Sequence, residues 1–129
     1  MNIYKKLIDN ECVTIDKASG MPKLVKHKEG YQVGVRTILT LPMELVNSKL
    51  LGDLIMGIEN PDDDYVISFW IEPVSNRLEV KSSIFIKSVY KAYNFGELHD
   101  QKVVWDYELK QELFISQKYL NLRKDFNLL

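Results

Sequence analysis

A thiol and two imidazoles are the side chains of this sequence best suited to nucleophilic chemistry. Cys12 is the single cysteine, and the two histidines are His27 and His99. A cysteine and a histidine need only meet in space, because the imidazole can then take the thiol proton. Cys12, however, stands beside Val13 in a short strand-like run, and no local signature of a reactive thiol accompanies it. The favoured interpretation is therefore a small buried hydrophobe.

A second group of titratable side chains follows Gly96. Glu97, His99 and Asp100 could provide a hydrolase with a histidine base and an orienting carboxylate. Such a cluster in a polar loop is more often simply solvated. The two histidines are far apart in sequence, and one cysteine cannot provide the paired spacing that is typical of zinc ligands. The sequence thus predicts a protein that is not an enzyme and that uses no metal or cofactor.

Carboxylates are concentrated in the stretch that precedes residue 65. Asp62, Asp63 and Asp64 could bind a hard cation, but they lack the spacing and the distant glutamate of a calcium loop. Six acidic side chains between residues 44 and 64 face only Lys49, whereas residues 17–28 are rich in lysine. We therefore expect one end of the fold to be acidic and able to steer a basic protein partner. Mixed charge that merely keeps a small domain soluble is the alternative.

Composition sets broad limits on the class of protein. The 129 residues fit one domain, 1–129, that is long enough to bury a sizeable core. Its 17 basic and 18 acidic residues give a net charge of −1, so no long-range attraction to nucleic acid or to an anionic membrane is expected. One cysteine, no signal-peptide pattern and no apolar run of the ~20 residues that cross a bilayer together predict a cytoplasmic protein.

The element that positions the other segments is a predicted antiparallel hairpin, Tyr65–Lys87. Tyr65, Ile67, Phe69 and Ile71 alternate onto one face of its first strand, and we expect them to lie beneath a helix at residues 50–58. Trp70 lies on the opposite face. Either a second layer covers this ring, or it is an exposed ring of the kind that anchors interfaces.

The remaining elements are predicted from hydrophobic periodicity and turn residues. They are a helix at 2–11, a strand at 12–15, a loop or edge strand at 21–30, a strand at 31–41 with a bulge at Gly34, a helix that starts at Asn47 or Ser48 and stops near 57–60, and a strand at 102–108. Residues 88–93 fit either helix or strand, with a break at 94–96. Residues 109–122 are predicted as a helix, with strand pairing of Leu113, Ile115 and Gln117 left open. The fold class is α+β: an antiparallel sheet of about four to six strands with a central hairpin, packed against one or two helices.

Three stretches carry a resemblance to the small immunity proteins of bacterial toxin systems: Gly30–Val35, Tyr65–Glu72 and Val103–Tyr107. The resemblance implies a protein-binding inhibitor that covers the active surface of a cognate toxin. The candidate contacts are Glu59, Asp62, Asp63, Asp64, Trp70 and Asp106. Alternatives are a phage-encoded or accessory protein that antagonises host machinery, and a small ligand-binding domain or enzyme. Unpaired edge strands also make a homodimer conceivable.

Overall fold

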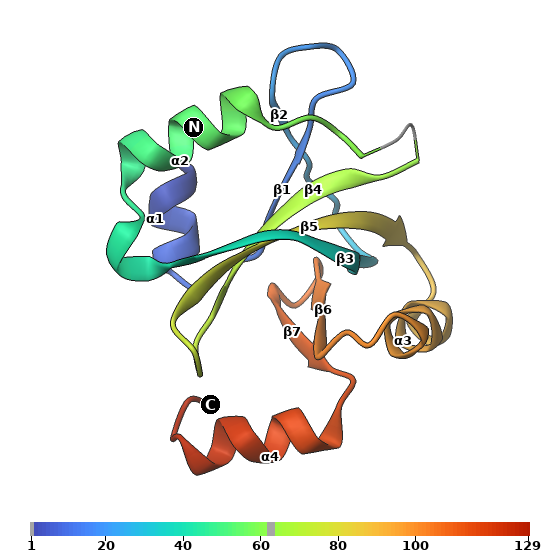
Figure 1. Ribbon diagram of the computed structural model, residues 1–129. Coiled ribbons are helices and arrows are strands. Elements are labelled where there is room, and N and C mark those ends of the chain that lie inside the picture. Colours follow the sequence, from blue (N-terminus) through green and yellow to red (C-terminus); the bar gives the residue numbers. More distant parts are fainter. Residues whose placement is uncertain (1, 62–63) are drawn as a thin grey trace.

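The computed structural model describes residues 2–61 and 64–129, and it has the α+β class that the sequence predicted (Figure 1). Its elements, in chain order, are α1 (Ile3–Ile8), β1 (Val13–Asp16), β2 (Lys23–Leu24), β3 (Tyr31–Pro42), a 3₁₀ turn (Met43–Leu45), α2 (Ser48–Gly57), β4 (Val66–Glu72), β5 (Arg77–Ile86), α3 (Val89–Leu98), β6 (Val103–Asp106), β7 (Gln111–Phe114) and α4 (Gln117–Asp125). None of the helices in these described residues is long and apolar enough to cross a membrane.

Seven strands form one antiparallel sheet in the order β2-β1-β4-β5-β3-β6-β7. The predicted hairpin is β4–β5, and it lies at the middle of that sheet. Of the two alternatives for residues 21–30, the edge strand holds for Lys23–Leu24. The described residues thus contain one strand more than the upper end of the expected range and four α-helices in place of one or two.

The long strand β3 is curved, and the sheet curls with it (Figure 1). Its pairing with β5 shifts register between Gly34 and Arg36 and again between Thr37 and Leu39, which confirms the bulge predicted at Gly34. A Cβ on Gly34 would meet the side-chain oxygen of Gln101, so glycine also gives the space that this neighbour needs. One face of the sheet is covered by helices. The other face is partly enclosed by the curl of the sheet, and we call it the enclosed face.

The first hydrophobic core lies between the sheet and two helices. Ile67 and Phe69 are fully buried in it, with Ile71 packed at its margin, as predicted, whereas Tyr65 of the same predicted set is only half-buried. The helices α1 and α2 cover this face, contributing Leu7 and Leu51 among others. The side-chain oxygen of Asn47 accepts a hydrogen bond from the Leu50 N–H at 2.8 Å, so α2 starts where the sequence predicted.

The second core lies under α3. Val33, Ala92, Val104 and Ile115 are its buried members. The sequence predicted a chain break at 94–96, and this was wrong, because α3 continues to Leu98 through a buried Gly96. A Cβ on Gly96 would collide with the side chain of Ile115, so this glycine allows the helix to approach the sheet closely.

The C-terminal segment divides into a strand and a helix. The helix predicted over residues 109–122 begins only at Gln117, and β7 precedes it. Two features set the boundary. Lys110 adopts a positive φ of 51° in the turn before β7, and the Ser116 hydroxyl caps α4 by accepting a hydrogen bond from the Tyr119 N–H at 3.1 Å. The strand alternative is therefore correct for Leu113, whereas Gln117 is helical.

Candidate functional site

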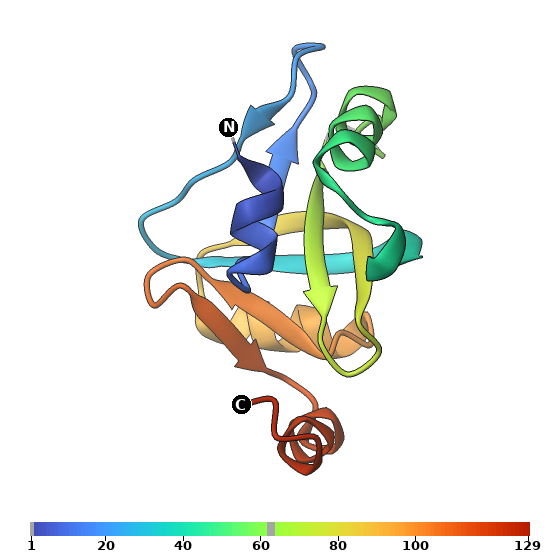
Figure 2. The ribbon, with the colours of Figure 1, turned by 90° about the vertical axis from the view of Figure 1, so that its left-hand side faces the viewer.

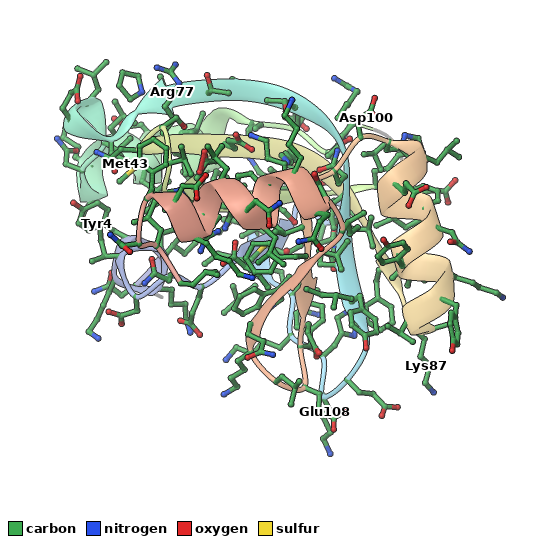
Figure 3. The ribbon with its side chains drawn as sticks, turned by 90° about the horizontal axis from the view of Figure 1, so that it is seen from below. Tyr4, Met43, Arg77, Lys87, Asp100 and Glu108 are labelled. Atoms are coloured by element: carbon green, nitrogen blue, oxygen red, sulfur yellow. The ribbon has the colours of Figure 1, made fainter. Side chains whose placement is uncertain are left out.

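Trp70 is not an exposed anchor, because α4 covers it. Only 7% of this residue is exposed, and the ring of Tyr119 stands edge-on to it with centroids 6.5 Å apart. Lys81 also lies over the ring, with Nζ 5.6 Å from its centroid. Figure 3 shows α4 lying across this side of the sheet. Of the two alternatives that the sequence left open, the covering layer is the correct one.

Asp106 is also buried, and it shapes a turn rather than offering a contact. Its Oδ1 accepts hydrogen bonds from the N–H groups of Glu108 and Leu109, at 3.0 and 3.1 Å. These bonds reverse the chain between β6 and β7. The residue is only 9% exposed, so little of Asp106 is accessible to a partner.

The acidic candidates fare differently. Glu59 and Asp64 are exposed, the first just after α2 and the second just before β4. Asp62 and Asp63 lie outside the described residues. The β6–β7 hairpin, with its own carboxylates, is well removed from this place in both ribbon views (Figures 1 and 2). The carboxylates of these two places therefore do not form one acidic surface.

Glu59 belongs to a surface that we call the α2 end: residues 16–21 together with 56–60. A buried lysine, Lys17, joins the two segments, because its Nζ donates to the Met56 carbonyl at 2.7 Å and its N–H donates to Asn60 Oδ1 at 3.2 Å. A cation suits the C-terminal end of a helix, where carbonyl groups concentrate negative charge. The position of Lys17 in the sequence suggested that it extends the basic stretch of residues 23–28. It does not, because its ammonium group is bound at the end of α2.

A second contact fixes the same surface. Asn60 Nδ2 donates to Asp16 Oδ1 at 2.9 Å, and the same oxygen accepts the Ala18 N–H at 2.9 Å. The hydrogen bonds from Ala18 and from Asn60 lower the pKa of Asp16. The carboxylate therefore stays ionised well below neutral pH, and the turn after β1 remains tied to the segment after α2.

Two methionines at the α2 end were not identified from the sequence. Met21 is 66% exposed and Met56 is 59% exposed. Unbranched thioether side chains adapt to irregular partners, which makes exposed methionines useful at binding surfaces. A signal was available for Met56, because it falls outside the apolar stripe of α2 that faces the core. The exposed carboxylate of Glu59 and the exposed thioethers of Met21 and Met56 therefore belong to one surface whose backbone is held by hydrogen bonds.

The enclosed face of the sheet carries a row of buried polar side chains. Hydroxyl contacts connect Thr14 to Ser68 at 2.7 Å and Ser68 to Ser83 at 2.6 Å. Gln32 Nε2 then donates to Ser83 at 2.8 Å, and the Tyr107 hydroxyl donates to Gln32 Oε1 at 2.8 Å. Each oxygen in the row has a partner, so the row stabilises the interior and does not present a free nucleophile.

The cysteine–histidine pair is brought near one place but is not assembled. Cys12 and His27 line the same cleft, yet no hydrogen bond joins them in the described part of the chain. Cys12 is half-buried, and desolvation raises the pKa of its thiol to about 12. His27 stacks on Phe85 with ring centroids 3.8 Å apart. The thiol therefore stays protonated at neutral pH, which is unfavourable for a nucleophile.

The cluster after Gly96 does not form a histidine–carboxylate pair either. The ring of His99 packs on Phe95 at 4.4 Å, and Glu97 and Asp100 are exposed. Within residues 2–61 and 64–129, no group of three or more potential ligands is placed to hold a metal ion.

Comparisons with known proteins add no relative. No model of a protein family matches the chain, and neither the curated proteins nor the solved structures include a significant match. The surfaces of the molecule itself therefore carry any proposal about what it does.

Proposed function

We propose that this protein is a non-enzymatic inhibitor that binds a partner protein, of the kind represented by the immunity proteins of bacterial toxin systems. The observation that carries the proposal is the α2 end, where Glu59, Met21 and Met56 are exposed on a rigid frame. A cognate toxin in the cytoplasm is the partner that fits the resemblance of the sequence.

The hydrogen-bonded frame of the α2 end favours binding, because little conformational entropy remains to be lost when a partner binds. Lys17 and Asn60 tie the turn after β1 to the segment after α2 through three hydrogen bonds. A surface that is already ordered loses less side-chain and loop freedom on association. We therefore expect the partner to meet this surface without a large rearrangement of either segment.

The chemistry of the surface indicates a basic partner with an apolar centre. Carboxylates at the rim speed encounter with a positively charged protein, whereas buried apolar contacts slow dissociation. Glu59 and Asp64 would supply the first effect, and Met21 and Met56 the second. If the partner is a nuclease, these carboxylates would occupy the groove that otherwise receives phosphates. Trp70 and Asp106 have no part in this contact.

A pair of matched double variants tests the proposal. Met56→Ser with Glu59→Lys changes the α2 end, and Glu97→Lys with Leu98→Ser makes the same changes of charge and polarity on α3, where both residues are also exposed. The partner would be captured by the unaltered chain from its native cells and then titrated with each variant. We expect the first variant to lose roughly tenfold or more in affinity and the second to bind normally.

Salt gives an independent measurement on the same pair. Affinity of the unaltered chain should fall as ionic strength rises, and the Met56→Ser, Glu59→Lys variant should show a weaker dependence. Equal losses for both variants, or a captured protein whose binding ignores the α2 end, would contradict the proposal.

A further inference from the structure

A cleft of about 300 Å³ lies between α1, β1, the chain that follows β2, and the β6–β7 hairpin. The chain that leads from β2 to β3 crosses from one sheet edge towards the other (Figure 2). It is fastened at both ends, because the Val25 N–H donates to the Thr14 carbonyl at 2.8 Å and the Tyr107 N–H donates to the Gly30 carbonyl at 3.0 Å. Between these points β1 and the β6–β7 hairpin stay apart, and the volume is of the order that holds a small molecule.

Cations gather around this cleft from three distant segments. Lys6 comes from α1, Lys26 from the chain after β2, and Lys110 from the turn before β7. One acid, Glu11, also lines it and lies 3.8 Å from the Lys6 ammonium. Three lysines against one glutamate make the cleft positive in a protein whose net charge is −1. Glu108, an acid at the tip of the β6–β7 hairpin (Figure 3), is not among the residues that line the cleft.

The inner surface of the cleft is apolar and aromatic. Val13, Leu24 and Val25 line it together with Trp105, which is 7% exposed. His27 and Tyr107 form one wall, their rings meeting edge to face at 5.0 Å. His27 is exposed, but partial desolvation lowers its pKa, so the lysines provide most of the positive charge at neutral pH. A planar ring could pack on this surface while its charged group met the ammonium groups.

The aromatic wall is fixed in place by glycine. His27 stacks on Phe85, with an interplanar angle of 16°. Gly30 has a φ of 93°, and a Cβ at this position would collide with the ring of Phe85. Only glycine allows both the backbone conformation and the close approach of that ring. The wall therefore exists before any ligand arrives, which favours binding.

We propose that this cleft binds a small organic anion: a carboxylate, sulfonate or phosphate carried on a planar apolar body. Lys26 and Lys110, both exposed at the mouth, would pair with the anionic group, and Trp105 and Tyr107 would contact the body. The site is independent of the inhibitor function, because it uses none of the residues of the α2 end. An extended nucleic acid is a poorer fit, since three lysines around one cleft form no continuous basic stripe.

Two fluorescent dyes with a common aromatic body test the proposal on the intact chain. 1-Anilinonaphthalene-8-sulfonate carries the anionic group, and N-phenyl-1-naphthylamine lacks it. We expect saturable binding of the sulfonate with one site per chain, at least about fivefold tighter than the neutral dye and weaker in high salt. Equal affinity of the two dyes, or a fluorescence rise that never saturates, would overturn the proposal.

Matched charge reversals locate the site. Lys26→Glu with Lys110→Glu should weaken binding of the sulfonate dye by about tenfold or more, because both charges at the mouth are inverted. Lys91→Glu with Lys124→Glu makes the same change at exposed positions of α3 and α4 and should leave binding unaltered. Circular dichroism and the thermal midpoint would show that each variant is folded. Equal weakening by both pairs would place the dye elsewhere and refute the assignment.

Competition then defines the anionic group. 2-Naphthoate and 2-naphthyl phosphate share an aromatic body and differ in the head, so their displacement of the bound dye ranks carboxylate against phosphate. Displacement by either supports the site and names its preferred head. If neither displaces the dye at concentrations well above its own dissociation constant, the cleft is not a site for organic anions.

Discussion

The two faces of the β4–β5 hairpin are covered by different kinds of contact, although they belong to the same two strands. On one face Ile67, Phe69 and Val80 are completely buried beneath α1 and α2. On the other face Ser83 is equally inaccessible and Ser68 is 7% exposed, but each is held by hydrogen bonds to its neighbours. A helix also covers this second face, since α4 lies over Trp70.

The difference matters because the two kinds of contact respond differently to a substitution. An apolar side chain contributes through the area that it removes from water and through its fit to its neighbours. A paired buried hydroxyl contributes little net stability. Its removal is costly, because the group that it bonded to is then buried without a hydrogen bond. The apolar face should therefore depend on volume and the enclosed face on pairing.

The largest effect is expected on the apolar face. Phe69→Ala removes a fully buried ring from the centre of the first core and leaves a cavity. We expect the free energy of unfolding to fall by about 3–5 kcal/mol, measured by urea denaturation. Phe126→Ala, at a largely exposed position, should change it by less than about 0.5 kcal/mol. A loss below ~1 kcal/mol for Phe69→Ala would mean that the core rests on other contacts.

The next effect concerns how α4 is held on the enclosed face. Arg123 forms two hydrogen bonds to the Glu112 carboxylate, both 3.1 Å long, and the two side chains are 8% and 17% exposed. Arg123→Met removes the guanidinium and leaves a mostly buried carboxylate alone. We expect the unfolding free energy to fall by about 2–3 kcal/mol. The loss is slightly smaller than for a fully buried ion pair, because the Glu112 side chain remains 17% exposed.

A double variant separates the buried charge from the lost packing. Glu112→Gln with Arg123→Met removes the carboxylate charge together with its partner, so part of the stability should return. If the double variant is as unstable as Arg123→Met alone, the effect comes from packing of the arginine stem and not from the unpaired carboxylate.

A smaller effect compares two neighbouring serines on opposite faces. Ser83 bonds to Ser68 and accepts a hydrogen bond from Gln32, whereas Ser82 belongs to the side that faces the apolar core. Ser83→Ala should cost about 1–2 kcal/mol, because it leaves buried partners unsatisfied. Ser82→Ala removes a buried hydroxyl that does not belong to the row of buried polar side chains, and it should cost less than Ser83→Ala. Equal effects of the two substitutions in urea denaturation would remove the distinction between the faces.

The apolar face could be predicted from the sequence and the cover of the enclosed face could not. Alternation alone placed Ile67 and Phe69 on one side and Trp70 on the other, because side chains in a strand alternate strictly. Whether Trp70 is exposed depends on α4, which lies about fifty residues further along the chain. Its start could not be located, because the short apolar run at 109–122 fits a helix or a strand.

The sites show the same limit. Counting charges placed Lys17 in a basic stretch, but a charge count contains no burial, and this lysine caps α2 instead. Asp106 counted as one more acidic side chain, because the sequence does not distinguish a carboxylate that shapes a turn from one that binds a partner. The cleft lined by Lys6, Lys26 and Lys110 has no signature in sequence spacing, since only the folded sheet brings those three segments together.

The smallest effect is a pH dependence that the enclosed face has and the apolar face lacks. Burial raises the pKa of Cys12 from 9.0 to about 12, so the folded protein disfavours the thiolate more strongly than the unfolded chain does. The resulting stability is fully present below pH 9 and is lost progressively as the pH rises towards 12. Burial raises the pKa of Tyr107 and Tyr119 above 10 as well, and these add their own losses at higher pH.

Cys12→Ala isolates the contribution of the thiol. We expect the variant and the unaltered chain to differ by a constant unfolding free energy between pH 7 and 8, where the thiol is protonated in both states. Between pH 9 and 10 the unaltered chain should lose stability faster, because its unfolded state alone begins to release the thiol proton, while the tyrosines affect both chains equally. Parallel curves through pH 10 in urea denaturation would show that solvent reaches Cys12 freely, and the enclosed face would then be open at that point.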